Sequence, residues 1–76
     1  MEMQKFIENF AAQFDDTDAS VFTAETVFHD LDEYSSLIAL SLIAMVDEEY
    51  DVQIKGDDMR ACVTIEDLYN IVKSRK

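Results

Sequence analysis

Residues 35–50 read SSLIALSLIAMVDEEY, and the architecture of the chain follows from this apolar stretch. Between Leu37 and Val46 only Ser41 is polar, so the segment is apolar almost all round. Its length and its Leu, Ala and Met residues favour a helix over a buried strand, and we expect this helix to run from about 36 to 51. Because such a helix must bury most of its surface, the rest of the chain has to cover it.

One side of this expected helix has some polar character. At about 100° per residue, Leu37, Ser41, Ala44 and Glu48 fall on one stripe, which we expect to face solvent or a partner. The other apolar residues of the segment must then find a core: Leu40, Leu42, Ile43, Val46 and Tyr50.

The preceding segment carries an amphipathic pattern. Met3, Ile7, Phe10 and Phe14 recur at helical spacing and predict a first helix over about 2–14. The polar run DDTDAS then ends it, since short polar side chains hydrogen-bond to nearby backbone and compete with helical pairing. The stretch 15–35 reads as a long connection, and we expect it to be ordered by a turn at 23–26 and by apolar residues that fix it to the helices: Phe22, Val27, Phe28 and Leu31.

The last third of the chain predicts one short and one longer helix. After Ile54, Lys55 and Gly56 break the pattern, and DDMRAC forms a helical turn at most. Thr64 is a good N-cap, with acids in the following turn and a basic SRK end, and predicts a helix over about 64–74. The expected fold class is therefore all-α: a small four-helix bundle of three longer helices and one short helix, with a long ordered loop between helices one and two.

Length and composition exclude several classes of site. The chain has 76 residues, 49% of them apolar, which predicts one domain over 1–76. A single glycine excludes Gly-rich phosphate loops, and one cysteine excludes an internal disulfide. With one histidine, His29, the chain lacks the ligands of a zinc site, and we expect no metal. The acidic N-terminal segment lacks a signal-peptide pattern and no run is long enough to span a bilayer, so we expect a cytoplasmic protein with no membrane association.

The charge distribution is strongly uneven. Seventeen acidic residues against six basic ones give a net charge of −11, and the six basic residues all lie outside 6–54, where twelve acids stand. This field disfavours nucleic acid as a partner and favours electropositive protein surfaces. Because so charged a small domain repels its own copies, we expect a monomer.

Catalysis is poorly supported by the residue types. General acid–base or nucleophilic work needs a base held beside an acceptor, and the chain offers one histidine in a loop. Ser35 and Ser36 do not lie in a Gly-x-Ser-x-Gly turn. We therefore expect no enzyme.

One constellation matches a known family. A phenylalanine and an acidic stretch lead to a Ser-Leu pair at the head of an apolar helix, as Phe28-His-Asp-Leu-Asp-Glu-Tyr-Ser-Ser-Leu37. This helix ends in the acidic run 47–49 and an aromatic, and the last helix begins Thr-Ile-x-Asp-Leu. Together with Thr23-Ala-Glu-Thr-Val-Phe28, these features resemble the acyl carrier proteins over nearly the whole chain.

The resemblance implies a covalent 4′-phosphopantetheine arm, taken from coenzyme A, on Ser36. A phosphodiester is suited to a helix N-terminus, where unpaired N–H groups and the helix dipole favour an anion. Ser35, where the family usually has Asp, and Leu37 flank this attachment site. The alternative is that Ser35 and Ser36 only cap the helix.

The resemblance also implies partners and cargo. These are a phosphopantetheinyl transferase, acyl-processing enzymes with basic docking patches, and acyl chains of fatty-acid or related lipid or polyketide biosynthesis. In the family the cavity between helices two and three receives the chain. Ile38 and Ser41 stand where the family is often acidic, so partners would meet a more apolar patch. Tyr34 is interpreted either as a partner contact or as packing of the loop. The expected partner-binding residues are Asp30, Asp32, Glu33, Tyr34, Ile38, Ser41, Asp47 and Glu48.

Two further expectations concern sulfur-containing residues and a rival function. Cys62 is predicted to be a buried structural cysteine, and Met45 and Met59 to fill the core. The rival to an acyl carrier is an acidic interaction protein without an arm, which docks on basic partner surfaces. The Ser35 replacement supports this rival, whereas the Ser-Leu junction and the apolar helix favour the carrier.

Overall fold

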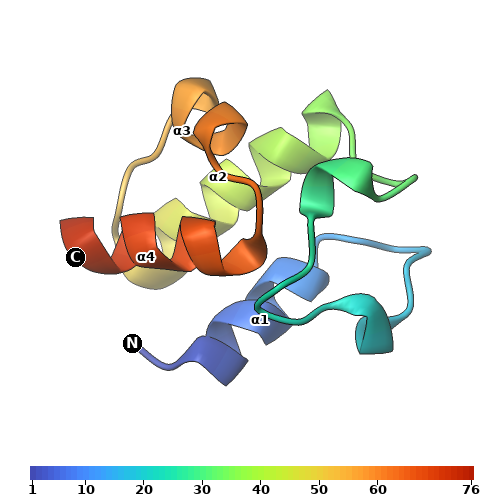
Figure 1. Ribbon diagram of the computed structural model, residues 1–76. Coiled ribbons are helices and arrows are strands. Elements are labelled where there is room, and N and C mark those ends of the chain that lie inside the picture. The colour runs from blue at the N-terminus through green and yellow to red at the C-terminus, as the bar shows by residue number, and fades with distance from the viewer.

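The computed structural model describes all residues 1–76 and consists of helices joined by ordered loops (Figure 1). Short 3₁₀ turns at Ala19–Val21 and Phe28–Asp30 lie in the connection between the first two helices. The only β-type pairing is an isolated bridge between Val27 and Thr64. The α-helices are α1 (Met3–Ala11), α2 (Ser36–Tyr50), α3 (Gly56–Ala61) and α4 (Ile65–Arg75). The predicted all-α fold of three longer helices and one short helix is confirmed.

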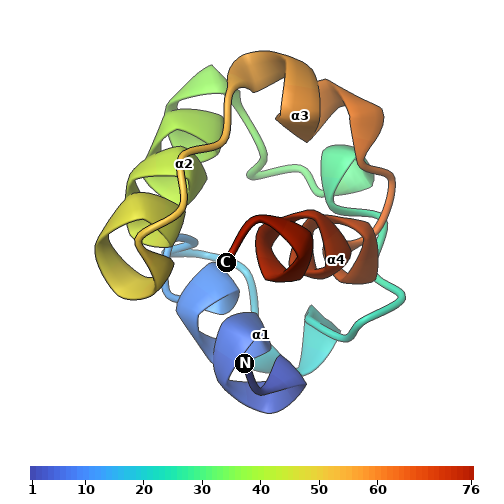
Figure 2. The same ribbon diagram turned by 90° about the vertical axis from the view of Figure 1, so that its left-hand side faces the viewer.

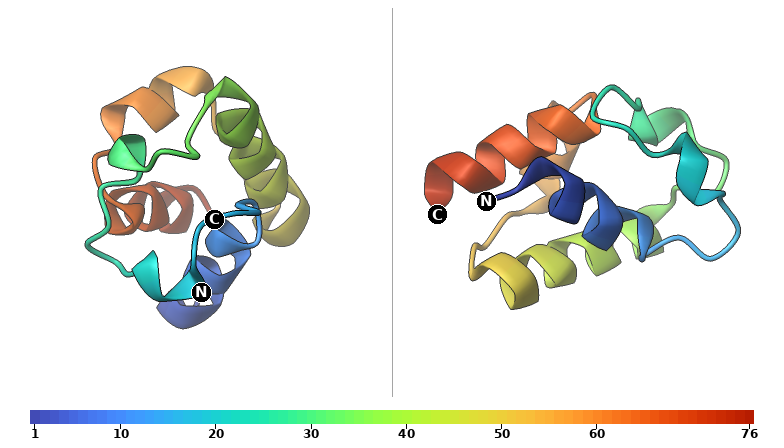
Figure 3. Two further views of the ribbon diagram at one scale, coloured as in Figure 1. Left: turned by 90° about the vertical axis from the view of Figure 1, so that its right-hand side faces the viewer. Right: turned by 90° about the horizontal axis from the view of Figure 1, so that it is seen from below.

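The helices surround one core. Helix α1 packs against α2 and α4, and α3 packs against the same two helices. Seen along α4, the other three helices are arranged around it (Figure 2). Both chain ends lie at the same end of the molecule, away from the start of α2 (Figure 3). All buried side chains are hydrophobic, and they are Phe6, Phe10, Phe14, Phe22, Phe28, Leu42, Met45, Val46, Tyr50, Val52, Ile54, Met59, Cys62, Ile65, Leu68, Tyr69 and Val72.

The first helix is shorter than predicted. It ends at Ala11, and the expected extension to residue 14 is wrong. The next residues form tighter turns, in which the Phe14 N–H donates to the Ala11 carbonyl at 3.0 Å. This turn brings the Phe14 ring onto Phe10, with centroids 5.7 Å apart, and onto Phe22, at 4.9 Å. Aromatic contacts therefore outweigh the helical periodicity at this position.

Helix α3 is the short helix predicted for this segment, and it begins at Gly56. Its six residues are held by side chains distant in sequence. Both oxygens of Asp58 accept hydrogen bonds from the Arg75 guanidinium, at 2.8 and 2.9 Å, and one also caps the Lys55 N–H. The Arg75 hydrogen bonds lower the Asp58 pKa to about 2. These contacts supply the stability that so short a helix lacks by itself.

The outward face of α2 is wider than predicted. Leu42, Val46 and Tyr50 are buried as expected, and Ile43 is half-buried. Leu40 is 62% exposed, so its assignment to the core is wrong. Because α2 is apolar all round, its sequence does not say which side its neighbours cover, and α1 and α3 leave Leu40 in solvent.

The long connection is ordered, as predicted. The Glu33 carboxylate accepts hydrogen bonds from the N–H groups of Asp15 and Asp16 and from the Thr17 hydroxyl, at 2.6 to 3.0 Å. The expected turn at 23–26 forms, with the Thr26 N–H donating to the Thr23 carbonyl. At the start of α4, the predicted cap Thr64 accepts the Asp67 N–H. The Ile65 and Glu66 N–H groups donate to the Thr26 and Ala24 carbonyls, so this turn of the loop is fixed to the start of α4.

Candidate functional site

Two serines occupy different places at the start of α2. Ser35 is the N-cap, with extended backbone, and its Oγ accepts the Ile38 N–H at 3.3 Å. Ser36 is the first helical residue and is exposed, and its hydroxyl makes no hydrogen bond within the protein. Capping therefore occupies Ser35 and leaves the Ser36 oxygen free to react.

A hollow of about 440 Å³ lies directly beside Ser36. Its apolar part comes from α2 and from Met59 of α3, and its polar part from hydroxyls, one imidazole and one guanidinium. A second hollow, of about 290 Å³, adjoins it along α2 and shares Leu40 and Ile43. The lining residues of the first hollow are His29, Tyr34, Ser35, Ser36, Ala39, Leu40, Ile43, Gly56, Met59 and Arg60. The two hollows form a groove between α2 and the segment containing α3.

An aromatic cluster closes one side of this groove. The His29 ring stacks on Phe28, with centroids 4.4 Å apart, and its Nε2–H donates to the Met59 carbonyl, with the two atoms 3.0 Å apart. Tyr34 meets Phe28 and His29 edge to face, at 5.4 and 4.9 Å. Burial raises the Tyr34 pKa. Tyr34 therefore packs within the loop, and its side chain also borders the groove.

Acidic side chains flank both ends of α2. Asp30 and Asp32 are exposed in the loop before α2, and Asp47 and Glu48 are exposed near its end. Glu33 differs from them, because its carboxylate is engaged by the 15–17 loop, and the Thr17 hydrogen bond lowers its pKa.

The exposed face of α2 between these acids is apolar. Leu37 is 76% exposed, Leu40 is exposed beside it, and Ala44 continues the face. Ile38 and Ser41 are partly buried at its edges. The predicted outward stripe is therefore present, with Leu40 added to it.

The sulfur-containing side chains lie in the core, as predicted. Cys62 is 1% exposed, and burial raises its pKa to about 11. The thiol is therefore protonated near neutral pH, which is typical of an inert structural cysteine. Met45 and Met59 are likewise buried.

The family model for the phosphopantetheine attachment site matches residues 5–72. The chain belongs to this family. Its members carry 4′-phosphopantetheine as a covalently attached group, and the acyl carrier proteins are typical of them. No curated protein and no solved structure matches the chain. None of its helices combines the length and apolar character that crossing a bilayer requires.

The residues at the start of α2 fit the attached group of the family. The free, exposed Ser36 hydroxyl offers an oxygen for esterification, and the hollow beside it has no acidic side chain that would repel a phosphate. The backbone N–H groups of the first turn of α2 favour an anion at this end of the helix.

Two residues at this hollow, Arg60 and His29, were not among the predicted site residues. Arg60 borders the hollow, and His29 joins the loop to α3. Both contacts depend on how the short helix α3 is placed against the loop and α2, which the sequence pattern does not specify. The sequence could have indicated Arg60, because it is one of only six basic residues and stands in the short helical segment, four residues after Gly56.

Proposed function

We propose that the protein is a non-catalytic acyl carrier that bears its phosphopantetheine arm on Ser36. The observation that carries this proposal is the pairing at the start of α2, where Ser35 caps the helix and Ser36 remains exposed without a hydrogen bond. The family match supports the nature of the attached group. When bound, this group supplies a thiol that holds an acyl chain as a thioester.

The chain's own residues then position and shelter the cargo. Ser36 Oγ attacks the phosphorus on the pantetheine side of the coenzyme A pyrophosphate. The bond from this phosphorus to the bridging oxygen breaks, adenosine 3′,5′-bisphosphate leaves, and the transferase accepts the hydroxyl proton. Leu40 and Ile43 offer an apolar wall along the groove for a carried chain. Helix α2 keeps its start fixed through the Ser35 cap, so the attachment point is held on a rigid element.

The docking surface of this carrier combines an apolar centre with an anionic border. Leu37, Ile38 and Ser41 form the centre together with Leu40, and Asp30, Asp32, Asp47 and Glu48 surround it. Tyr34 and Glu33 mainly pack and hydrogen-bond within the loop. The Glu33 carboxylate is held by the 15–16 backbone, so it contributes to docking through its negative charge and not as a mobile side chain. The partners are a phosphopantetheinyl transferase and acyl-processing enzymes with basic patches, which such a surface attracts by long-range electrostatics.

The proposal extends to the domain organisation, oligomeric state, location and pathway of the protein. The chain acts as one domain over 1–76 and as a monomer in the cytoplasm, in fatty-acid or related lipid or polyketide biosynthesis. The net charge of −11 supports the monomer, since identical anionic surfaces repel one another.

Intact mass spectrometry after incubation with coenzyme A and a broad-specificity transferase tests the attachment. We expect one added arm on the wild type and on Ser35→Ala, and none on Ser36→Ala. Circular dichroism should show that Ser36→Ala remains folded, because the Ser36 hydroxyl makes no hydrogen bond within the protein. Loading of Ser36→Ala but not of Ser35→Ala would move the attachment to Ser35. No added mass with several transferases would favour the rival, an acidic interaction protein without an arm.

A further inference from the structure

The hollow beside Ser36 differs in charge from the rest of the surface. The chain has 17 acidic residues, yet none lines this hollow. Its polar lining consists of the His29 imidazole, the hydroxyls of Tyr34, Ser35 and Ser36, and the Arg60 guanidinium. Arg60 is the only Lys or Arg among the lining residues, so it supplies the fixed positive charge of the hollow.

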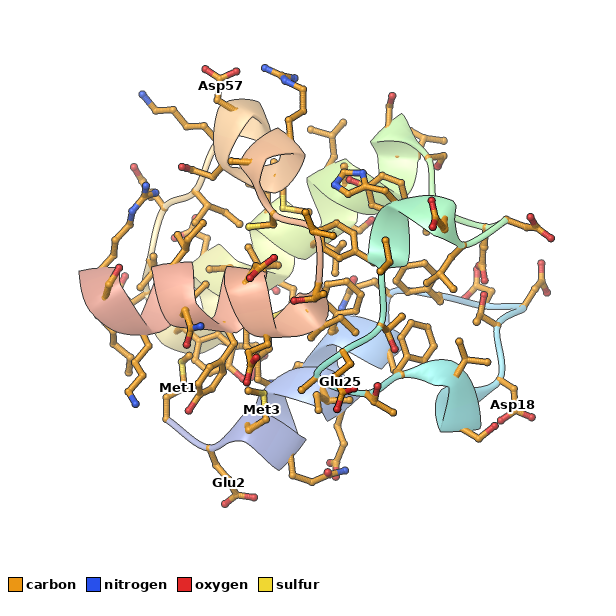
Figure 4. The ribbon with its side chains drawn as sticks, viewed as in Figure 1. Met1, Glu2, Met3, Asp18, Glu25 and Asp57 are labelled. Atoms are coloured by element: carbon orange, nitrogen blue, oxygen red, sulfur yellow. The ribbon has the colours of Figure 1, made fainter.

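The Arg60 guanidinium lies across the start of α3. One of its nitrogens, Nη1, would be 3.5 Å from a Cβ built on Gly56, which also lines the hollow. Its ion pair is with Asp57, one turn earlier, and the two side chains are 73% and 88% exposed. Asp57 points away from the body of the protein at the outer end of α3 (Figure 4). Because exposed pairs of this kind contribute little, and a guanidinium has five N–H donors, Arg60 retains donors for a second anion.

We propose that this hollow is an anion-binding subsite of the loaded protein, with Arg60 as the counter-ion of a negatively charged oxygen group on the arm. The inference rests on the proposed attachment at Ser36. Ser36 and Arg60 line the same hollow, so a phosphate esterified to Ser36 Oγ begins at the edge of a hollow that Arg60 also borders. The Tyr34 hydroxyl has no hydrogen-bond partner within the protein and provides a second donor.

The arm can bring an anionic oxygen to this hollow from two sources. One is its own phosphodiester, and the other is a carboxylate on the carried acyl group. The neighbouring hollow is less suited to an anion, because its Lys55 is accompanied by the acid Asp47. Either source would connect the start of α2 with α3 across the groove, and α3 would then be held by a contact that the unloaded protein lacks.

Side-chain NMR of the two arginines distinguishes the sources. The chain contains only Arg60 and Arg75, so Arg60→Gln assigns both Nε–H signals. The signals are compared in the apo protein, in the form carrying the arm with a free thiol, and in the butyryl- and succinyl-loaded forms. A shift of the Arg60 signal when the arm is attached, with Arg75 unchanged, identifies the phosphodiester. A shift that appears only with the succinyl group identifies the carboxylate.

Thermal unfolding provides an independent readout. We expect attachment of the anion-bearing group to raise the melting temperature by about 2–4 °C in the wild type, as befits one partly exposed charged contact. The gain should remain in Lys5→Gln, which removes an exposed charge on α1, and should disappear in Arg60→Gln. A salt concentration of about 1 M should reduce it.

Several results would overturn the inference. These are an unchanged Arg60 signal in every loaded form, equal shifts of both arginine signals, or a full thermal gain in Arg60→Gln. If mass spectrometry shows the arm in place, such a result removes the subsite and leaves the carrier function intact. If no arm is added to the wild type, the attachment at Ser36 fails, and the subsite fails with it.

Discussion

The two ends of the core are held together in different ways. Around α1 the contacts are aromatic, and Phe10 touches the rings of Phe14, Phe22 and Phe28 at 5.4 to 6.1 Å between centroids. Around α3 one buried side chain of the helix, Met59, is supplemented by hydrogen bonds from His29 and Arg75. The α1 contacts are therefore mainly buried aromatic area, whereas α3 combines one buried side chain with a few hydrogen bonds.

The same contrast extends to what each end exposes. The aromatic end buries the rings of Phe6, Phe10, Phe14 and Phe22, and the other end leaves Leu37 and Leu40 in solvent beside Ser36. A folded protein exposes adjacent large apolar residues of this kind mainly where another surface binds. The aromatic end therefore contributes most to the core, and the exposed leucines at the α2–α3 end support the docking surface proposed above.

The largest expected effect breaks the aromatic end. Phe10→Ala should lower the free energy of unfolding by about 3–5 kcal/mol, because it removes a fully buried ring and leaves a cavity among three others. Chemical denaturation monitored by circular dichroism measures this loss.

Leu40→Ala is the matched truncation at the other end. Its effect on unfolding should stay within about 0.5 kcal/mol, since the side chain is 62% exposed. Its binding to the transferase should weaken by at least about 1 kcal/mol, measured as Kd by calorimetry. Equal losses of stability in the two variants would contradict the division between the two ends.

A smaller effect is expected where α2 begins. Ser35→Ala should cost about 1 kcal/mol of stability, because the Ile38 N–H loses its acceptor, and loading of the arm should continue. Ser41→Ala is the control, since Ser41 makes no side-chain hydrogen bond, and it should leave the denaturation midpoint nearly unchanged. If both variants behave alike, the Ser35 cap does not contribute measurably.

The polar attachment of α3 should be pH-dependent. The Arg75 hydrogen bonds lower the Asp58 pKa from 3.8 to about 2, so their stabilisation is present above about pH 4 and is lost as the pH falls through about 2. Asp58→Asn should therefore cost about 1 kcal/mol at pH 7, and the difference from the wild type should shrink towards pH 2.

The neighbouring acid gives a control for this prediction. Asp57 is 88% exposed and pairs only with Arg60, so Asp57→Asn should change the stability little at any pH. A cost of Asp58→Asn that is the same at pH 7 and pH 2, in urea titrations, would mean that the ion pair with Arg75 is not its cause.

The smallest expected effect concerns the whole surface. A net charge of −11 on 76 residues opposes compaction, and salt screens this repulsion. The melting temperature should therefore rise by a few degrees between very low salt and about 0.15 M. An unchanged melting temperature would show that repulsion is not a significant contribution at either end.

Most of the fold could be predicted from local signals in the sequence. The start of α2 at Ser36 follows from a capping serine before an apolar run, and α4 follows from Thr64 and the acids after it. The end of α1 could not be predicted in this way, because the Phe14 ring packs on the rings of Phe10 and Phe22, and Phe22 lies outside the helical pattern.

Only part of the site could be predicted, because it too depends on contacts between elements that local sequence patterns do not show. The exposed stripe on α2 follows from helical geometry, yet the exposure of Leu40 depends on which sides α1 and α3 cover. The placement of α3 against α4 involves the contact between Asp58 and Arg75, which are 17 residues apart in the sequence. Contacts between distant residues leave no pattern in a single sequence.

The Glu33 carboxylate connects the loop before α2 to the segment that follows α1. Glu33 lies three residues before Ser36, and its carboxylate accepts hydrogen bonds from the backbone just after α1. The proposed attachment region and the end of α1 therefore contact the same side chain. A cationic side chain of a docking enzyme that competes for Glu33 would release residues 15–17. Docking beside Ser36 would then loosen the segment that follows α1, even if the partner made no contact with that segment.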